Sequence, residues 1–257
     1  MKNLLFWLYV VIAIVLIALG YTYWESKVTD SEAQDDVVAQ STGKDSSTAD
    51  SSKKDKKEDA SKPNKDLFKS KEFQKIYNTE TKDGKKMNIT LVSTPYQTSE
   101  ENTSVKDELE SSIDDHIKLT DLEVAGVSTA VTSEDIYDGD PDLIVLDALT
   151  LNDFFESVPL DNHINTLENI YNDVEQNDIP VVIIGTRREY DNPDFNDYQK
   201  AEEDYFGNKD NNFRYVSQSG DWPDDETISD DYNVDEGLLT TDGVDLWTTA
   251  ISDYLFK

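Results

Sequence analysis

The chain has 257 residues, no cysteine, and 55 acidic against 23 basic side chains, for a formal net charge of −32. The absence of cysteine excludes disulfides, thiolate metal sites, a cysteine nucleophile and a lipidated cysteine anchor. So acidic a chain is expected to repel nucleic acid and anionic membrane surfaces.

An uncharged apolar run stands near the start of the sequence. Residues 4–24, LLFWLYVVIAIVLIALGYTYW, carry no charged side chain, and a helix of that length spans roughly 30 Å of bilayer. Lys2 precedes the run and Glu25 follows it, so the positive-inside rule places residues 25–257 outside the cytoplasm. We therefore predict that residues 1–24 form a retained, single-pass transmembrane signal anchor in the cell membrane. A cleaved signal peptide is the alternative.

Residues 25–66 have a different composition. They contain no aromatic residue, eleven acidic residues and eight lysines. Such a segment cannot bury enough apolar surface to offset its ordering entropy, so we predict a disordered linker. As a flexible coil it would act as a tether with a root-mean-square reach of about 35 Å.

Residues 67–86 are predicted to form a helical lead-in to the folded domain, which we place at residues 87–257. In that domain, apolar runs bounded by turn residues recur, as expected for strands. The runs at 142–149 and 180–185 barely alternate, which indicates that both faces of the sheet are covered. The five predicted strands are 87–92, 122–127, 142–149, 180–185 and 213–217.

Helical patterns separate these strands. Apolar residues recur at every fourth position from residue 105 to 117, behind an approximate capping box of Ser104 and Asp107. Two further apolar stripes run over residues 164–174 and 246–255. Strands that alternate with helices predict an α/β domain with a three-layer, doubly wound, mainly parallel sheet, as in flavodoxin-like folds.

Sheets of this type bind ligands at the carboxyl ends of their strands. The segments expected at this edge are 93–96, 126–129, 150–153, 186–188 and the stretch 241–247, just ahead of the last helix.

Four short blocks lie along these segments in chain order. They are ITLVSTP (89–95), VAGVST (124–129), PDLIVLDALTLND (141–153) and TDGVDLW (241–247). Together they resemble the blocks of the SGNH/GDSL hydrolase superfamily, whose members are esterases, lipases and carbohydrate deacetylases. The resemblance covers residues 87–257.

The resemblance implies a nucleophilic serine after the first strand and, near the end of the chain, a catalytic histidine three residues after an aspartate. In this sequence the nucleophile position is Pro95, and the base position is Asp245, three residues after Asp242. It further implies that Asn152 donates to the oxyanion, although Thr150 stands where the family has glycine. We assign no catalytic residue, cofactor or metal ion. The candidate cleft residues are Ser93, Thr94, Gly126, Ser128, Asn152, Asp153, Asp242 and Asp245.

Other interpretations of single residues stay open. Ser93 or Ser128 is a nucleophile displaced from the family register, or a turn residue. His116 is expected to be a half-buried helix residue, and His163 a polar residue at a helix start. Asn152 either serves the oxyanion or starts a turn.

Acidic stretches at 138–142 and 221–237 suit diffuse association with hard cations. Neither follows the order of an EF-hand loop. Arg187 and Arg188 are expected to pair with surrounding acids, with an anionic substituent at the cleft as the alternative.

These observations predict an extracytoplasmic, membrane-anchored SGNH-like domain that binds or regulates in the cell envelope. Its expected partners are the membrane, through the N-terminal helix, and a cell-envelope glycan or an envelope-assembly protein; nucleic acid is not expected. The rival hypothesis is an active esterase or deacetylase that acts on acylated cell-surface polysaccharide with a rearranged nucleophile. A third is a structural, salt-adapted surface module.

Overall fold

A computed structural model describes residues 62–233 and 237–257. All of them fall within one compact unit, Glu58–Lys257. The predicted anchor at residues 1–24 and the predicted linker up to residue 61 lie outside the described residues. Among the residues that are described, no helix has both the length and the apolar character that crossing a membrane requires.

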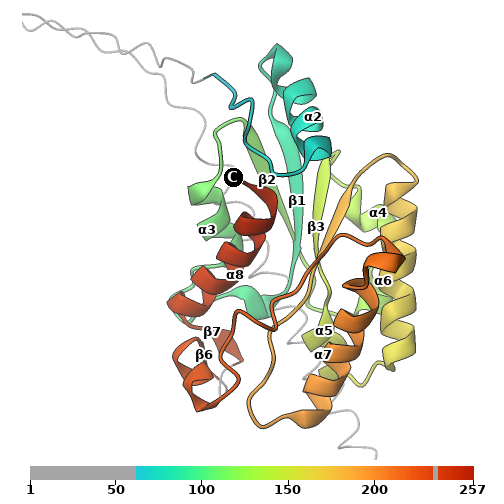
Figure 1. Cartoon of the computed structure of the whole chain (residues 1–257), viewed down its shortest axis with the longest axis vertical. Helices are drawn as coiled ribbons and strands as arrows, with labels where there is room; N and C mark the ends of the chain where they lie inside the picture. Colours follow the sequence, from blue (N-terminus) through green and yellow to red (C-terminus); the bar gives the residue numbers. More distant parts are fainter. Residues whose placement is uncertain (1–61, 234–236) are drawn as a thin grey trace, which may run out of the picture. The chain divides into compact units, whose positions relative to one another are not determined.

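Five parallel strands form the central sheet (Figure 1). Their order is β2-β1-β3-β4-β5, so the chain starts near the middle and winds outward in both directions, which confirms the predicted parallel α/β sheet. The strands are β1 (Met87–Ser93), β2 (Ile117–Glu123), β3 (Leu143–Asp147), β4 (Val181–Ile184) and β5 (Tyr215–Val216). A separate antiparallel pair joins β6 (Tyr232–Asn233) to β7 (Leu238–Leu239).

Helices cover both faces of the sheet, which makes three layers (Figure 1). Alternate side chains of β3 enter the two separate apolar cores, Leu143 and Val145 on one face and Ile144 and Leu146 on the other. This two-sided burial explains why the strand has no polar alternation in the sequence. The first face carries α2 (Lys71–Glu80), α3 (Val105–Ser112) and α8 (Thr241–Leu255); the second carries α4 (Ser133–Ile136), α6 (Leu160–Glu175) and α7 (Pro193–Phe206).

The helix predicted to follow β1 is shorter than its sequence pattern. Ser104 and Asp107 form the predicted capping box, with the Asp107 N–H donating to Ser104 Oγ at 3.1 Å. However, α3 ends at Ser112, and Ile117 is the first residue of β2. The second strand was predicted at 122–127, but β2 covers Ile117–Glu123, so it starts five residues earlier than predicted.

The cause of the early helix end is a turn around Asp114. Its side chain accepts the backbone N–H of His116 at 2.8 Å and the hydroxyl of Tyr77 at 2.9 Å. An aspartate that binds its own backbone two residues on stabilises a turn in competition with helix. The fourth apolar residue of the stripe, Ile117, therefore belongs to the sheet.

The two ends of the described chain are joined. Phe68 and Phe256 form an isolated antiparallel bridge. On either side of it, the Lys69 N–H donates to the Leu255 carbonyl at 2.9 Å and the Lys257 N–H donates to the Leu67 carbonyl at 3.0 Å. The helical lead-in predicted at 67–86 contains this bridge, helix α2 and a 3₁₀ turn at Thr81–Asp83.

Candidate functional site

The carboxyl edge of the sheet is shaped by the segments that follow β1, β3 and β4. The 3₁₀ turn Pro95–Gln97 follows β1, and the short helix α5 (Thr150–Phe155) follows β3. Because Val92 pairs with Leu146 in the parallel register, these two segments leave the sheet side by side. At that junction Gln97 Nε2 donates to Asp147 Oδ2 at 2.5 Å.

Asp147 is a buried carboxylate at the centre of this edge. It also accepts the N–H of Leu149 at 2.6 Å. Burial raises the pKa of Asp147 to about 7, and the hydrogen bonds from Leu149 and Gln97 only partly oppose that rise.

The nucleophile position of the resemblance holds no hydroxyl. Pro95 is the first residue of the 3₁₀ turn, and proline has neither a hydroxyl nor a backbone N–H. Next to it, Thr94 is buried, and Ser93 Oγ donates to Asp121 Oδ1 on the neighbouring strand at 2.6 Å. The Ser93 hydroxyl is thus held by a carboxylate and has no contact with a histidine.

The base position lies on a helix and not in a loop. Helix α8 begins at Thr241, so the prediction that 241–247 precedes the last helix was wrong by one to two turns. Asp242 and Asp245 stand at its first turns and both are exposed. Thr240 caps the helix by accepting the Gly243 N–H at 3.2 Å. Acidic residues are favoured at a helix N-terminus because they face its free N–H groups.

Gly243 explains how tightly this helix start is packed. A Cβ added there would lie 2.0 Å from the backbone oxygen of Asp231. The glycine of the DGV sequence is therefore required by a close backbone approach, and it does not form a turn ahead of the helix.

Asn152 connects two loops at the carboxyl edge. Its Nδ2 donates to the Val124 carbonyl at 3.1 Å and to the Gly126 carbonyl at 2.7 Å. A carboxamide nitrogen carries two hydrogens, so both donors are used within the fold. No side-chain donor of Asn152 remains for an oxyanion in this arrangement.

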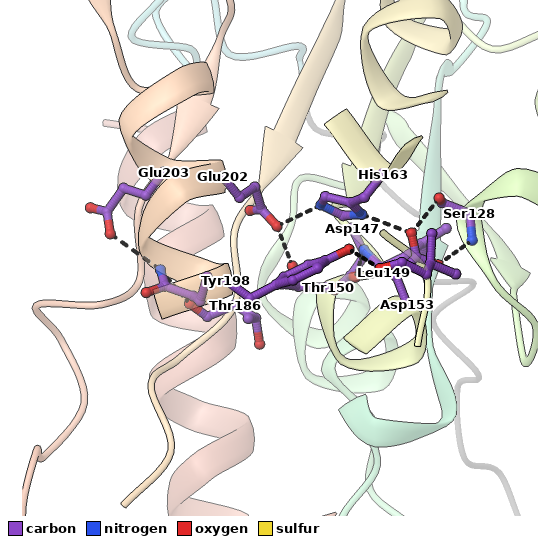
Figure 2. A network of polar contacts seen from close by, with 12 residues as sticks. Ser128, Asp147, Leu149, Thr150, Asp153, His163, Thr186, Tyr198, Glu202 and Glu203 are labelled. Atoms are coloured by element: carbon purple, nitrogen blue, oxygen red, sulfur yellow. Dashed lines mark hydrogen bonds and ion pairs between the residues drawn. The ribbon is translucent and has the colours of Figure 1, made fainter. Parts of the chain in front are cut away.

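Ser128 and Asp153 belong to a buried network around His163 (Figure 2). Asp153 accepts the Ser128 N–H at 2.6 Å, and its other oxygen accepts the Ser128 hydroxyl. His163 Nδ1 lies 2.8 Å from Asp153 Oδ2, and its Nε2 lies 2.9 Å from Glu202 Oε2. Glu202 also accepts the Thr150 hydroxyl at 2.5 Å.

His163 is therefore a positively charged link between two carboxylates. Its side chain is 0 % exposed, as is that of Asp153. Burial opposes protonation, but the hydrogen bonds to Asp153 and Glu202 outweigh it and raise the pKa of His163 to about 9. With both ring nitrogens donating, this histidine cannot accept a proton near neutral pH. His163 lies in the first turn of α6, as expected for a residue at a helix start, but its side chain is fully enclosed, which the sequence did not indicate.

His116 lies at the opposite edge of the sheet. It stands in the turn that leads into β2, with Nδ1 2.8 Å from Asp114 Oδ1. The prediction that it is a helix residue was wrong, because α3 ends at Ser112. Neither histidine contacts a serine or threonine hydroxyl.

Arg187 is buried just after β4. Its guanidinium lies 3.5 Å from the centre of the Tyr232 ring and 6.0 Å from that of Trp222. Glu189 is its carboxylate partner at 3.5 Å, which agrees with the expected pairing with a nearby acid. Aromatic rings stabilise a desolvated cation through their electron-rich faces, and burial lowers the pKa of Arg187. This side chain is packed within the fold and does not project into solvent.

Asp242 borders a small acidic groove. The groove has a volume of about 250 Å³ and is lined by Ser99, Glu100, Glu101, Asp230, Thr240, Thr241 and Asp242. Within residues 62–233 and 237–257, no group of three or more histidines and carboxylates is arranged to hold a metal ion.

The candidate residues thus separate into three places. Gly126, Ser128, Asn152 and Asp153 come together, whereas Ser93 and Thr94 follow β1, and Asp242 and Asp245 lie on α8. The sequence analysis missed Glu202, Gln97 and Asp147. Of these, only Asp147 had a visible signal: it is the one acid inside the apolar run 143–149.

The arrangement of strands and helices in this chain is similar to that of solved structures described as a GDSL-like lipase and an acylhydrolase. Two solved structures illustrate the likeness. A GDSL-like lipase from Bacteroides thetaiotaomicron superposes with a TM-score of 0.52 at 16 % identity, over 70 % of this chain and 95 % of its own. A protein from Streptococcus pneumonia, provisionally described as a platelet activating factor, gives 0.51 at 16 % identity, over 72 % and 91 %.

At this level of identity the likeness shows the fold alone. It confirms the fold that the resemblance implied. No family model matches the sequence, and a comparison with curated proteins gives no significant match. The chemistry of the site therefore has to be argued from the residues themselves.

Proposed function

We propose that this chain is a membrane-anchored, extracytoplasmic protein of the cell envelope whose SGNH-like domain binds or regulates and does not hydrolyse. One observation carries the proposal: neither histidine is hydrogen-bonded to a serine or threonine hydroxyl in the described part of the chain, and each has a carboxylate partner. Without such a pair the domain lacks the activated nucleophile of serine acyl transfer.

Serine catalysis needs three groups in one place: a hydroxyl, a base within about 3 Å of it, and donors for the oxyanion. Pro95 supplies no hydroxyl, and Asp245 is an exposed carboxylate on α8. Asn152 donates both amide hydrogens to backbone carbonyls, so neither is left for an oxyanion. Loss of any one of these groups lowers the rate by orders of magnitude. The combined replacements favour a binding or regulatory role.

The envelope setting rests on the sequence. The apolar run at residues 4–24 and the position of Lys2 support an anchor with the domain outside the cytoplasm. We propose a cell-envelope glycan or an envelope-assembly protein as the partner of the domain. Protease added to intact cells should remove the folded domain but leave a short, membrane-bound N-terminal fragment. Protection of the domain would contradict the proposed orientation.

The test of the catalytic part is a hydrolysis assay on residues 58–257, with a short acyl ester and an acetylated polysaccharide as substrates. We expect no turnover above that of buffer. The domain is compared with its Ser93→Ala and Ser128→Ala variants, and with Ser229→Ala as a matched control at an exposed serine. Turnover that survives Ser229→Ala but disappears in either of the other two variants would establish the rival hypothesis of a rearranged nucleophile.

A further inference from the structure

The charge of this protein is segregated along the chain. Residues 62–86 contain eight lysines and four acidic residues, a net charge of +4. Residues 87–257 contain eight basic and 41 acidic residues, a net charge of −33. The negative charge from which repulsion of anionic surfaces is expected therefore belongs to residues 87–257 and not to the segment around α2.

Helix α2 lies across the amino edge of the sheet, opposite the carboxyl edge (Figure 1). The hydroxyl of Tyr77 reaches Asp114, just ahead of β2, and Glu72 pairs with Arg214, just ahead of β5, at 2.7 Å. These contacts fix α2 over the starts of strands on both sides of β1. The lysines of α2 therefore lie at the amino end of the sheet, whereas Asn152 and Asp153 lie in α5, beyond the carboxyl end of the sheet.

A groove of about 580 Å³ runs along α2, and five lysines line it. Two have partners: Lys69 donates to the Asp253 carbonyl, and Lys257 pairs with Asp66. The other three, Lys71, Lys75 and Lys82, are exposed, and their ammonium groups make no hydrogen bond or ion pair within residues 62–233 and 237–257. In a protein so rich in carboxylates, this concentration of unneutralised lysines provides a site for an external polyanion. The lysine face is defined as these five residues.

We propose that the lysine face docks on the anionic lipid headgroups of the membrane that holds residues 1–24. This inference rests on the proposed anchoring. Each lysine brought to an anionic surface raises the binding constant about five-fold. The net charge of −33 on residues 87–257 is repelled by the same surface, so the domain turns these residues away from the membrane. Attraction and repulsion therefore favour the same orientation.

The position of the tether strengthens the argument. Residue 62 adjoins the lysine face in the sequence, and four further lysines occur at positions 53, 54, 56 and 57. A linker with the flexibility predicted from the composition of residues 25–66 would have a reach of about 35 Å, which would make docking effectively intramolecular. Docked in this way, the domain directs its carboxyl edge outward, toward partners in the envelope.

The experiment uses the full chain in vesicles of phosphatidylcholine, with or without one third phosphatidylglycerol. Since the protein has no cysteine, Asn78→Cys on the lysine face and Ser229→Cys near α8 each give a unique dye position. A spin label on the lipid headgroup quenches the dye only on contact. We expect quenching at position 78 in anionic vesicles, none at position 229, and little at either position in neutral vesicles.

Charge removal provides the decisive comparison. The combined change Lys71→Gln, Lys75→Gln and Lys82→Gln should lower the docked-to-free ratio about 100-fold, at five-fold for each lysine. The matched control, Lys106→Gln, Lys200→Gln and Lys209→Gln, should leave it unchanged. Added salt should release the domain, since the Debye length is about 8 Å at physiological ionic strength.

Three results would overturn the proposal. The first is equal quenching at position 78 in neutral and anionic vesicles, and the second is an equal effect of the two triple variants. The third is that soluble polyphosphate lowers quenching at position 78 while phosphatidylglycerol has no effect on it. The last would assign the lysine face to a phosphate polymer. Failure of the anchoring itself is distinguishable, because the chain would then not float with the vesicles at all.

Discussion

Removal of the charge at His163 should destabilise the domain in a pH-dependent way. The imidazolium is enclosed between Asp153 and Glu202 with no solvent exposure. In His163→Gln, the amide still donates to a carboxylate, but the cation is gone. Two buried carboxylates then face each other without a counter-charge, a situation that commonly costs 3–5 kcal/mol, so we expect a loss of about 3 kcal/mol near pH 6.

The pH dependence follows from the pKa of His163. The folded value of about 9 lies above the ordinary value of 6.5, so the native state binds the proton more tightly than the unfolded chain. The stabilisation is fully present below pH 6.5 and is lost as the pH rises through 9. A difference of this size corresponds to about 3 kcal/mol at 1.36 kcal/mol per pKa unit.

Urea unfolding of residues 58–257, followed by circular dichroism at pH 6, 8 and 10, measures this effect. The gap between wild type and His163→Gln should be large at pH 6 and should shrink by about 3 kcal/mol at pH 10. His116→Gln is the control, since that side chain is partly exposed and has one carboxylate neighbour. A gap that stays constant with pH would mean that His163 is neutral in the folded protein, and the reasoning would be refuted.

Three further changes test other parts of the site. Asp147→Asn should stabilise the domain by about 2 kcal/mol at pH 8 in thermal or urea unfolding. The rise of the Asp147 pKa from 3.8 to about 7 means that folding loses stability as the pH rises from 3.8 to 7, by about 4 kcal/mol in all, and weaker hydrogen bonds from Leu149 and Gln97 to the amide should offset about half of the gain. Equal stability to wild type at pH 8 would contradict the raised pKa. Gly243→Ala should lower the free energy of unfolding by about 2 kcal/mol, because the added Cβ clashes with the Asp231 backbone. Gly126→Ala is the control and should lower it much less, because the space around its Cβ is open. Similar melting temperatures for the two variants would refute the close approach at Gly243. Asn152→Ala should cost about 1–3 kcal/mol by freeing two part-buried carbonyls, and amide exchange should rise in residues 124–128; unchanged exchange there would show that the link is unimportant.

The sheet was predictable because its strongest signals are local. The runs at 142–149 and 180–185 became β3 and β4, since unbroken apolar residues are what a two-sided parallel strand requires. The start of β2 was missed because Ile117 continues the four-residue spacing of α3, and only the side chain of Asp114 marks the turn between them. Helix α7 was not predicted, although Asn192 and Pro193 form a recognisable start.

The site was less predictable, because it depends on residues far apart in the chain. His163 carries no local sign of its environment: its partners come from α5 and, 39 positions later, from α7. A glutamate in an apparently solvated helix is normally exposed, so Glu202 could not be identified before the fold was known. By contrast, the resemblance alone predicts that Pro95 and Asp245 stand at the positions of the family's serine and histidine, and this stays a prediction.

The backbone ladder between residues 67–69 and 255–257 has a mechanical consequence. Tension that reaches the domain through residue 62 meets the hydrogen bonds between Asn64 and α2 and then those to Leu255 and Lys257, before any strand of the central sheet is loaded. Residues 255–257 therefore hold residues 67–69 against the domain. Removal of residues 255–257 would leave the central sheet complete but would lower the force needed to detach residues 67–69 from the domain.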